Sequence, residues 1–208
     1  MGYQVILDVI GSSVIGGILL LTVLNFNMQN IETKRTMQTE MIAITDIGTA
    51  IEIISEDFSR IGYCQQRNVI KLPVITNASK NEISFKTDVI NNVTGLGDGV
   101  EDIVSYKITG PNNSSPEPGD NLLQRSINGG PWQIVYANAS QFRLKYYKYN
   151  KNNYNDSLST PVSASNLEYI RRVTLDIKGI STNTGSSFAD PGKLITSEVS
   201  NSMSFEIR

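Results

Sequence analysis

The chain begins with a long run of apolar and small residues. Within residues 1–31 Asp8 is the only charged side chain. The uncharged span 9–31 is longer than the roughly 20 residues that a helix needs to cross a hydrocarbon core of about 30 Å. We therefore expect residues 1–27 to form an apolar helix that is held in a membrane or in the core of an assembly.

The helical pattern continues beyond this run, but with apolar residues on one face only. Steps of three and four residues separate eight apolar positions: Met37, Met41, Ile44, Ile47, Ile51, Ile54, Phe58 and Ile61. This spacing predicts an amphipathic helix over residues 28–62, with Gly62 at its end. We expect the apolar stripe to dock on the rest of the chain, and the paired carboxylates Glu56 and Asp57 to be solvated on another face.

Residues 63–208 alternate between apolar and polar positions, as β-strands do. The segments with this pattern are 69–75, 82–86, 102–109, 121–127, 132–137, 141–149, 168–180 and 194–207. Residues 128–131 predict a hairpin turn, and the segment 181–192 is expected to be a loop. The predicted fold is therefore α+β: a long N-terminal helix, apolar in its first half and amphipathic in its second, packed on an antiparallel β-sheet head.

Composition narrows the chemistry that this chain can perform. Its 208 residues include no histidine and a single cysteine, and the formal net charge is −2. The chain thus lacks the commonest general base and zinc ligand, and it cannot form an internal disulfide. The charge gives no electrostatic case for nucleic acid. We expect no catalytic, cofactor-binding or metal-binding site, and a membrane-tethered enzyme is the least favoured class.

Three short motifs have a functional and a simpler interpretation. Residues 97–99 (Gly-Asp-Gly), with Glu101 and Asp102, resemble half of a calcium loop but lack the ligand spacing of an EF-hand. A polar turn is the simpler interpretation. Residues 145–149 mix Lys and Tyr, as in single-strand nucleic-acid binders, yet the two faces of a strand also explain them. Cys64 is expected to be a small buried hydrophobe rather than a reactive thiol.

Two features of the apolar helix favour packing against other helices. Asp8 places a carboxylate in a segment where an unpaired charge is costly. Small residues, which let helices approach closely in lipid, are expected to form one side of the helix: Gly11, Ser12, Ser13, Gly16 and Gly17. An ordinary membrane anchor and a removed signal peptide are the alternatives. A signal peptide should have a basic start and a small-residue cleavage site, and neither accompanies this run.

This order of elements resembles type IV pilins and the pseudopilins of type II secretion, and most nearly PilW-like minor pilins and J-type pseudopilins. The phrases that carry the resemblance are 57–63 (DFSRIGY), 102–108 (DIVSYKI), 123–125 (LQR), 142–147 (FRLKYY) and 170–173 (IRRV). The resemblance implies a filament subunit that waits in the bacterial inner membrane. It would polymerise through its N-terminal helix with copies of itself or related pilins, into an extracellular or periplasmic filament with the β head on its surface.

The resemblance also implies a processing junction and an assembly carboxylate. Gly2 and Tyr3 form the candidate junction, where a leader is removed and the new terminus is methylated. In the family a glutamate at the fifth mature position neutralises the terminal amine of a neighbouring subunit. Asp8 would be the sixth residue after cleavage at this junction, and Val5 is the fifth residue if the chain begins at Met1. Asp8 is the candidate for the assembly role in both cases.

The alternative function is a single-pass, membrane-anchored β-domain that acts as an adhesin or a sensor. Such a protein is expected to carry basic residues on the cytoplasmic side of its span. Here Lys34 and Arg35 follow the span, and the positive-inside rule alone would place the head in the cytoplasm. A basic leader that is removed from the precursor would resolve this conflict.

Overall fold

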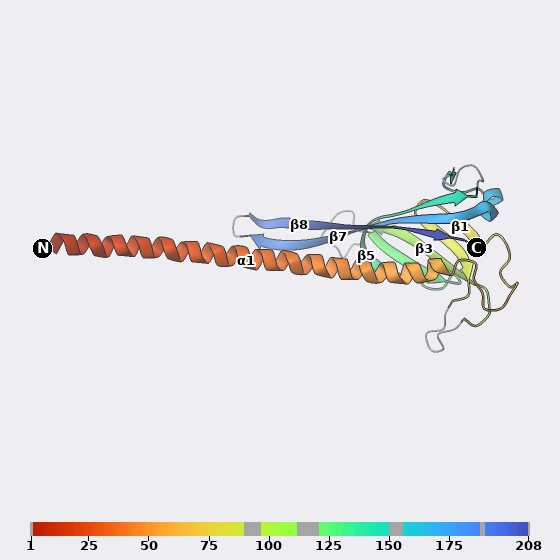
Figure 1. The fold of residues 1–208 in the computed structure, drawn as a ribbon, viewed down its shortest axis with the longest axis horizontal. Helices are drawn as coiled ribbons and strands as arrows, with labels where there is room; N and C mark the ends of the chain where they lie inside the picture. The colour runs from red at the N-terminus through yellow and green to blue at the C-terminus, as the bar shows by residue number, and fades with distance from the viewer. Residues whose placement is uncertain (1, 90–96, 112–120, 150–155, 188–189, 208) are drawn as a thin grey trace. The chain divides into compact units, whose positions relative to one another are not determined.

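The computed structural model describes residues 2–89, 97–111, 121–149, 156–187 and 190–207 (Figure 1). The chain divides into two compact units. The first comprises Met1–Met41 and Thr182–Ile195, and the second comprises Ile42–Ser181 and Thr196–Arg208. The α+β fold expected from the sequence is confirmed: a long N-terminal helix precedes an antiparallel sheet.

Helix α1 is one continuous element, Gly2–Ser59, and supplies residues to both units. At 1.5 Å per residue it is roughly 87 Å long. It ends two residues before the last predicted apolar position, Ile61. Gly62 then adopts a positive φ of 79°, which favours glycine, and its N–H donates to the carbonyl of Lys86 at 2.9 Å. The prediction that Gly62 closes the helical region is therefore confirmed.

The strands form one sheet in the order β1-β2-β3-β4-β5-β7-β8, and β6 pairs with β5. Neighbours in the sheet follow one another along the chain, so most connections are simple antiparallel returns (Figure 1). The bounds are β1 Ile75–Ala78, β2 Glu82–Thr87, β3 Asp102–Pro111, β4 Asn121–Ile127, β5 Gln133–Lys148, β6 Ser157–Leu158, β7 Ile170–Ser187 and β8 Asp190–Glu206. A short 3-10 helix, η1 (Ala164–Tyr169), precedes β7.

The predicted strands differ from the observed ones in four places. The strand predicted over 69–75 is wrong, because Pro73 lacks an N–H for a ladder and β1 begins only at Ile75. Segments 132–137 and 141–149 are one strand, β5, whose register shifts between Ala139 and Gln141. Residues 168–169 belong to η1. The loop expected over 181–192 is also wrong, since β7 and β8 continue through most of it.

The core of the second unit lies between the last turns of α1 and one face of the sheet. Phe58 is buried, and its ring meets those of Phe85 and Tyr106 edge-on, at 5.3 and 5.7 Å between centroids. Alternate residues of the strands complete this core: Ile83, Val104, Leu123, Phe142, Leu144, Tyr146, Val173, Leu175 and Ile177. The period-two pattern of the strands therefore predicted the buried face correctly.

The predicted apolar stripe of α1 is right only in its second half. Ile47, Ile54, Phe58 and Ile61 are buried, as expected, and Ile51 is partly buried. Met37, Met41 and Ile44 are exposed. For Ile44, which belongs to the second unit, the expectation that it docks on the head is therefore wrong. The buried face continues instead through two small residues, Ala43 and Ala50. A stripe traced through large apolar residues omits Ala43 and Ala50, because alanine occurs both at close helix contacts and on exposed helix surfaces.

Candidate functional site

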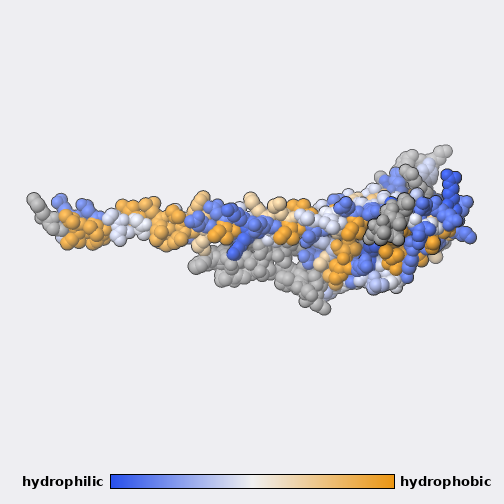
Figure 2. All heavy atoms as spheres, turned by 90° about the horizontal axis from the view of Figure 1, so that it is seen from below, coloured by the Kyte–Doolittle hydropathy of each residue, from blue (hydrophilic) through white to orange (hydrophobic). Residues whose placement is uncertain are grey.

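The first half of α1 is apolar on all sides and has no cover. Every large apolar side chain from Tyr3 to Leu24 is between 49% and 77% exposed. Figure 2 shows this segment as mostly hydrophobic surface, with hydrophilic patches near its N-terminal end and a paler band within it. A helix that is apolar all round belongs inside a membrane or a core. By length and composition α1 is able to cross a membrane, and its most apolar 18-residue window contains no buried residue.

The candidate assembly residues lie near the start of this apolar segment. Gly2 opens α1, and the adjacent Tyr3 is largely exposed. Asp8 is exposed two turns further on and has no hydrogen bond or ion pair to any residue that the structure describes. An unpaired carboxylate is costly in an apolar environment, so Asp8 needs a partner wherever this segment is covered.

The small residues of the segment are not required by packing within this chain. A Cβ atom added at Gly11, Gly16 or Gly17 would meet nothing within 4 Å. Since a helix turns by about 100° per residue, Ser12, Ser13 and Gly16 share one face, whereas Gly11 lies on the opposite side. We call the face formed by Ser12, Ser13 and Gly16 the narrow face. It is centred on Gly16, and its small side chains would let another helix approach closely in lipid.

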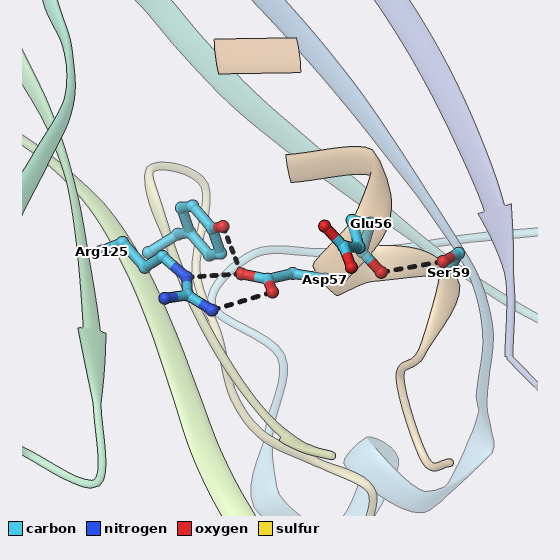
Figure 3. Close-up of polar contacts among 5 residues, drawn as sticks. Glu56, Asp57, Ser59 and Arg125 are labelled. Carbon is cyan, nitrogen blue, oxygen red and sulfur yellow. Dashed lines mark hydrogen bonds and ion pairs between the residues drawn. The ribbon is translucent and has the colours of Figure 1, made fainter. Parts of the chain in front are cut away.

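The other end of α1 is fixed to the sheet by a charged cluster, the Asp57 clamp, made of Asp57, Tyr106 and Arg125. Figure 3 shows Arg125 facing Asp57. Arg125 Nε and Nη2 donate to the two carboxylate oxygens of Asp57, at 2.6 and 2.9 Å. Tyr106 Oη donates to Asp57 Oδ2 at 2.5 Å. The charged side chains of Arg125 and Asp57 are only 16% and 13% exposed. The prediction that Asp57 is solvated is therefore wrong, while Glu56 is exposed as expected.

Sheet register explains why the Asp57 clamp forms. Tyr106 on β3 and Arg125 on β4 are directly paired residues, so their side chains rise from the same face. Arg125 also follows Leu123 by two positions and therefore shares the core-facing side of β4. A signal for the clamp was thus present in the sequence: an arginine on the apolar face of a strand needs a buried carboxylate as its partner.

Burial and charge set the protonation states of the Asp57 clamp. Burial, reinforced by the negative charge of Asp57, raises the pKa of the Tyr106 hydroxyl. Burial alone would lower the pKa of Arg125, but its hydrogen bonds and charge interaction with Asp57 raise it overall. At neutral pH the Asp57 clamp therefore holds a neutral tyrosine and a charged arginine on one carboxylate. Its charge-assisted hydrogen bonds attach the end of α1 to the sheet.

A second buried carboxylate, Asp88, accounts for the Gly-Asp-Gly motif. The backbone N–H groups that donate to its oxygens, at 3.0–3.1 Å, come from Gln65, Asp98 and Gly99. A Cβ on Gly97 would approach the Asp88 carboxylate to 2.3 Å, so only glycine fits there. Carboxylate oxygens of Asp88, Asp98 and Asp102 lie within 4.8 Å of one another. The carboxylate oxygens of Asp88 already accept hydrogen bonds from backbone N–H groups. This arrangement is a polar turn, the simpler interpretation of residues 97–99.

Cys64 lies beside this carboxylate, with its Sγ 3.7 Å from Asp88 Oδ2. It is partly rather than fully buried, so the expectation of a buried hydrophobe holds only in part. Burial raises the pKa of the thiol, and the nearby charge of Asp88 adds to this rise. The thiolate, which is the reactive form, is consequently disfavoured.

The chain is similar to known proteins in structure rather than in sequence. No protein-family model matches this sequence. No curated protein matches it either. Among solved structures, the chain is similar to a type IV-like pilin from Thermus thermophilus, with a TM-score of 0.46 and 8% sequence identity. The similarity covers 78% of this chain and 95% of the other.

Proposed function

We propose that this protein is a structural subunit of a type IV pilus-like filament or of a secretion pseudopilus. The observation that carries the proposal is the first half of α1, which is apolar on every side and exposed. Exposure of apolar surface costs about 25 cal/mol per Å², so this segment needs a cover. The inner membrane supplies it before assembly, and helices of neighbouring subunits supply it in the filament.

The proposed division of labour follows the chain. Residues 1–27 form the membrane-stored helix that enters the filament core. Residues 28–62 continue it as an amphipathic helix into the head. Residues 63–208 form the head, which faces the outside of an extracellular or periplasmic filament. Partners are copies of this chain or related pilins, and assembly requires no cofactor.

Asp8 and the narrow face of α1 have separate roles in this proposal. Asp8 pairs with the terminal amine of a neighbouring subunit, because both charges are costly in an apolar core unless they meet. The terminus is created by cleavage between Gly2 and Tyr3 and is methylated. Ser12, Ser13 and Gly16 then allow close helix contact, with Gly17 relieving crowding on one flanking side and Gly11 leaving room for a helix on the opposite side.

Among pilins and pseudopilins, the branch that we propose is the PilW-like or J-type one. The protein would then be a minor, tip-type subunit. Three of the phrases that carry this resemblance meet in the Asp57 clamp: one contains Asp57, another Tyr106 and the third Arg125. Two others, in β5 and β7, are paired neighbours in the sheet. The resemblance therefore covers residues that act together, which supports a shared architecture of the head.

Removal of residues 1–27 tests the proposal. The shortened protein and the full chain are produced in the native cells, and sheared filaments and membranes are probed for each. We expect the full chain in both fractions, and the shortened protein only as a soluble monomer by sedimentation. A shortened protein that still enters filaments would contradict the proposal. A full chain that stays dispersed in the membrane would favour the anchored adhesin or sensor.

A substitution at Asp8 tests the assembly role more finely. Asp8→Ala is expected to lower the amount of the protein in filaments at least tenfold without lowering its amount in the membrane. Asp46→Ala is the matched control, since Asp46 is an exposed carboxylate further along the same helix. Equal incorporation of the two variants would show that Asp8 has no part in assembly.

A further inference from the structure

A cavity lies where the pairing between neighbouring strands is interrupted. The register of β5 against β7 skips Ser140, and that of β3 against β4 shifts between Thr109 and Pro111. The turn between β1 and β2 contacts β5 beside this break, where the N–H of Leu144 donates to the carbonyl of Lys80 at 2.8 Å. The cavity has a volume of about 390 Å³, within the usual range of small-molecule sites, and it belongs to the second unit.

Five polar side chains in the lining of this cavity have no partner of their own. They are Lys80, Asn81, Ser140, Gln141 and Arg143. None of these side chains forms a hydrogen bond or an ion pair with a residue that the structure describes. All five can donate hydrogen bonds, and two of them carry a positive charge. The proposed filament role uses none of them, and together they suit an anionic ligand.

No carboxylate that the structure describes occupies the two cations. The described residues of the lining include no acidic one. Asp176 lies opposite Arg143 in the ladder between β5 and β7, but other groups hold its carboxylate. Lys145 Nζ is 3.6 Å from Asp176 Oδ2, and the Ser202 hydroxyl donates to Asp176 Oδ1 at 2.6 Å. The guanidinium of Arg143 is therefore available to a ligand.

The carboxylate nearest to Lys80 in the sequence, Glu82, is also held by another residue. Its Oε1 accepts a hydrogen bond from Asn77 Nδ2 at 2.9 Å, and Lys107 lies directly opposite it on β3. Each carboxylate next to the cavity thus has a partner and a facing cation outside the lining. Lys80 and Arg143 remain in excess, although the formal charge of the whole chain is −2.

We propose that the cavity binds the phosphate monoester of a small sugar or polyol. The phosphate meets Lys80 and Arg143, because a planar guanidinium matches two phosphate oxygens. A phosphate ion alone would leave much of the 390 Å³ unfilled. The amides of Asn81 and Gln141 can both donate and accept, so with the Ser140 hydroxyl they bind the hydroxyl groups of the sugar or polyol. A nucleic-acid strand fits less well, since its affinity depends on several successive phosphate contacts.

Calorimetric titration of the full chain in a non-ionic detergent tests this proposal. The probes are glucose 6-phosphate, glucose and inorganic phosphate. We expect glucose 6-phosphate to bind at least tenfold more tightly than either of the other two, because it alone combines the charged group with hydroxyl groups.

Substitutions of the two cations show whether binding occurs in this cavity. Lys80→Ala and Arg143→Ala should each weaken the binding of glucose 6-phosphate at least tenfold. Arg67→Ala is the matched control and should leave the affinity unchanged, because Arg67 is an exposed cation outside the lining. Lys80 and Arg143 are exposed as well, so all three variants should keep the unfolding midpoint of the parent.

Four results would overturn the proposal. They are no binding of glucose 6-phosphate, equal affinity for glucose, equal affinity for inorganic phosphate, and an affinity for glucose 6-phosphate that neither Lys80→Ala nor Arg143→Ala changes. Equal affinity for glucose would mean that the two cations are already neutralised. Tighter binding of a single-stranded oligonucleotide than of glucose 6-phosphate would assign the cavity to nucleic acid instead. Filament assembly is independent of all these outcomes.

Discussion

The Asp57 clamp places a charged carboxylate where little water reaches it. Removal of one member of such a pair leaves the other charge buried without its partner, which typically costs about 3–5 kcal/mol. Because both side chains retain some exposure, we expect Asp57→Asn to lower the free energy of unfolding by about 2–4 kcal/mol. Denaturant unfolding followed through the fluorescence of Trp132, the single tryptophan, measures this change.

The residue next to Asp57 provides the matched control. Glu56 is a carboxylate of the same helical turn, but it is exposed. Glu56→Gln should change the free energy of unfolding by no more than about 0.5 kcal/mol, as is usual for surface positions. Similar losses for Glu56→Gln and Asp57→Asn would mean that the clamp contributes nothing specific.

Buried tyrosines make the head sensitive to alkali. Burial raises the pKa of Tyr106 and Tyr146 above the ordinary value of about 10. The folded state therefore keeps protons that the unfolded state loses above that pH, so stability is full below pH ~10 and falls as the pH rises further. We expect the unfolding midpoint to drop between pH 9 and 11, and to drop less in Tyr106→Phe. If the unfolding midpoint of Tyr106→Phe fell with pH as steeply as that of the parent, the alkali sensitivity could not be assigned to Tyr106.

At the scale of single residues, local patterns do not encode contacts between distant parts of the chain. The helical pattern puts Asp57 on the polar face of α1, because such a pattern contains no information about which side chains lie opposite. Arg125 held the missing information, since it occupies the core-facing side of β4. The pairing depends on a contact between residues 68 positions apart, which no local pattern encodes. Tyr147 likewise belongs to a motif that the sequence shows, but its position beside Arg172 requires the fold.

At the scale of elements, α1 is joined to the sheet mainly by apolar contact around Phe58. Its ring is buried and touches three other aromatic rings, including that of Phe205. We expect Phe58→Ala to cost about 3–5 kcal/mol of unfolding free energy, as for other large core deletions. Ile44→Ala should cost well under about 1 kcal/mol, because Ile44 is 56% exposed. Denaturant unfolding measures both changes. A large loss of unfolding free energy for Ile44→Ala alone would show that Ile44, and not Phe58, faces the sheet.

The elements were predictable to the extent that periodicity defines them. The helix and the strands of the central sheet have clear periods, and they were found. The end of β7 lies outside the predicted strands because residues 181–187 are polar or glycine and have no apolar alternation. The strand expected before Ile75 was wrong because an apolar run with an interior proline cannot complete a ladder.

At the scale of the whole chain, the apolar first half of α1 is the feature that the head cannot explain. It contributes no buried side chain from Tyr3 to Leu24. The glycines there meet no atoms that would exclude a larger residue. These properties are costly for a protein that remains alone in water, and they are useful for one that exchanges lipid for neighbouring helices.

Cross-linking within assembled filaments tests the central proposal most directly. In a Cys64→Ser background, a cysteine introduced by Gly16→Cys lies on the narrow face of α1, and one introduced by Glu52→Cys lies on its exposed amphipathic half. A short thiol cross-linker is applied to filaments in the native cells. We expect Gly16→Cys to yield species linked to a second copy or a related pilin, and Glu52→Cys to remain monomeric. Efficient cross-linking at position 52 with none at position 16 would contradict it.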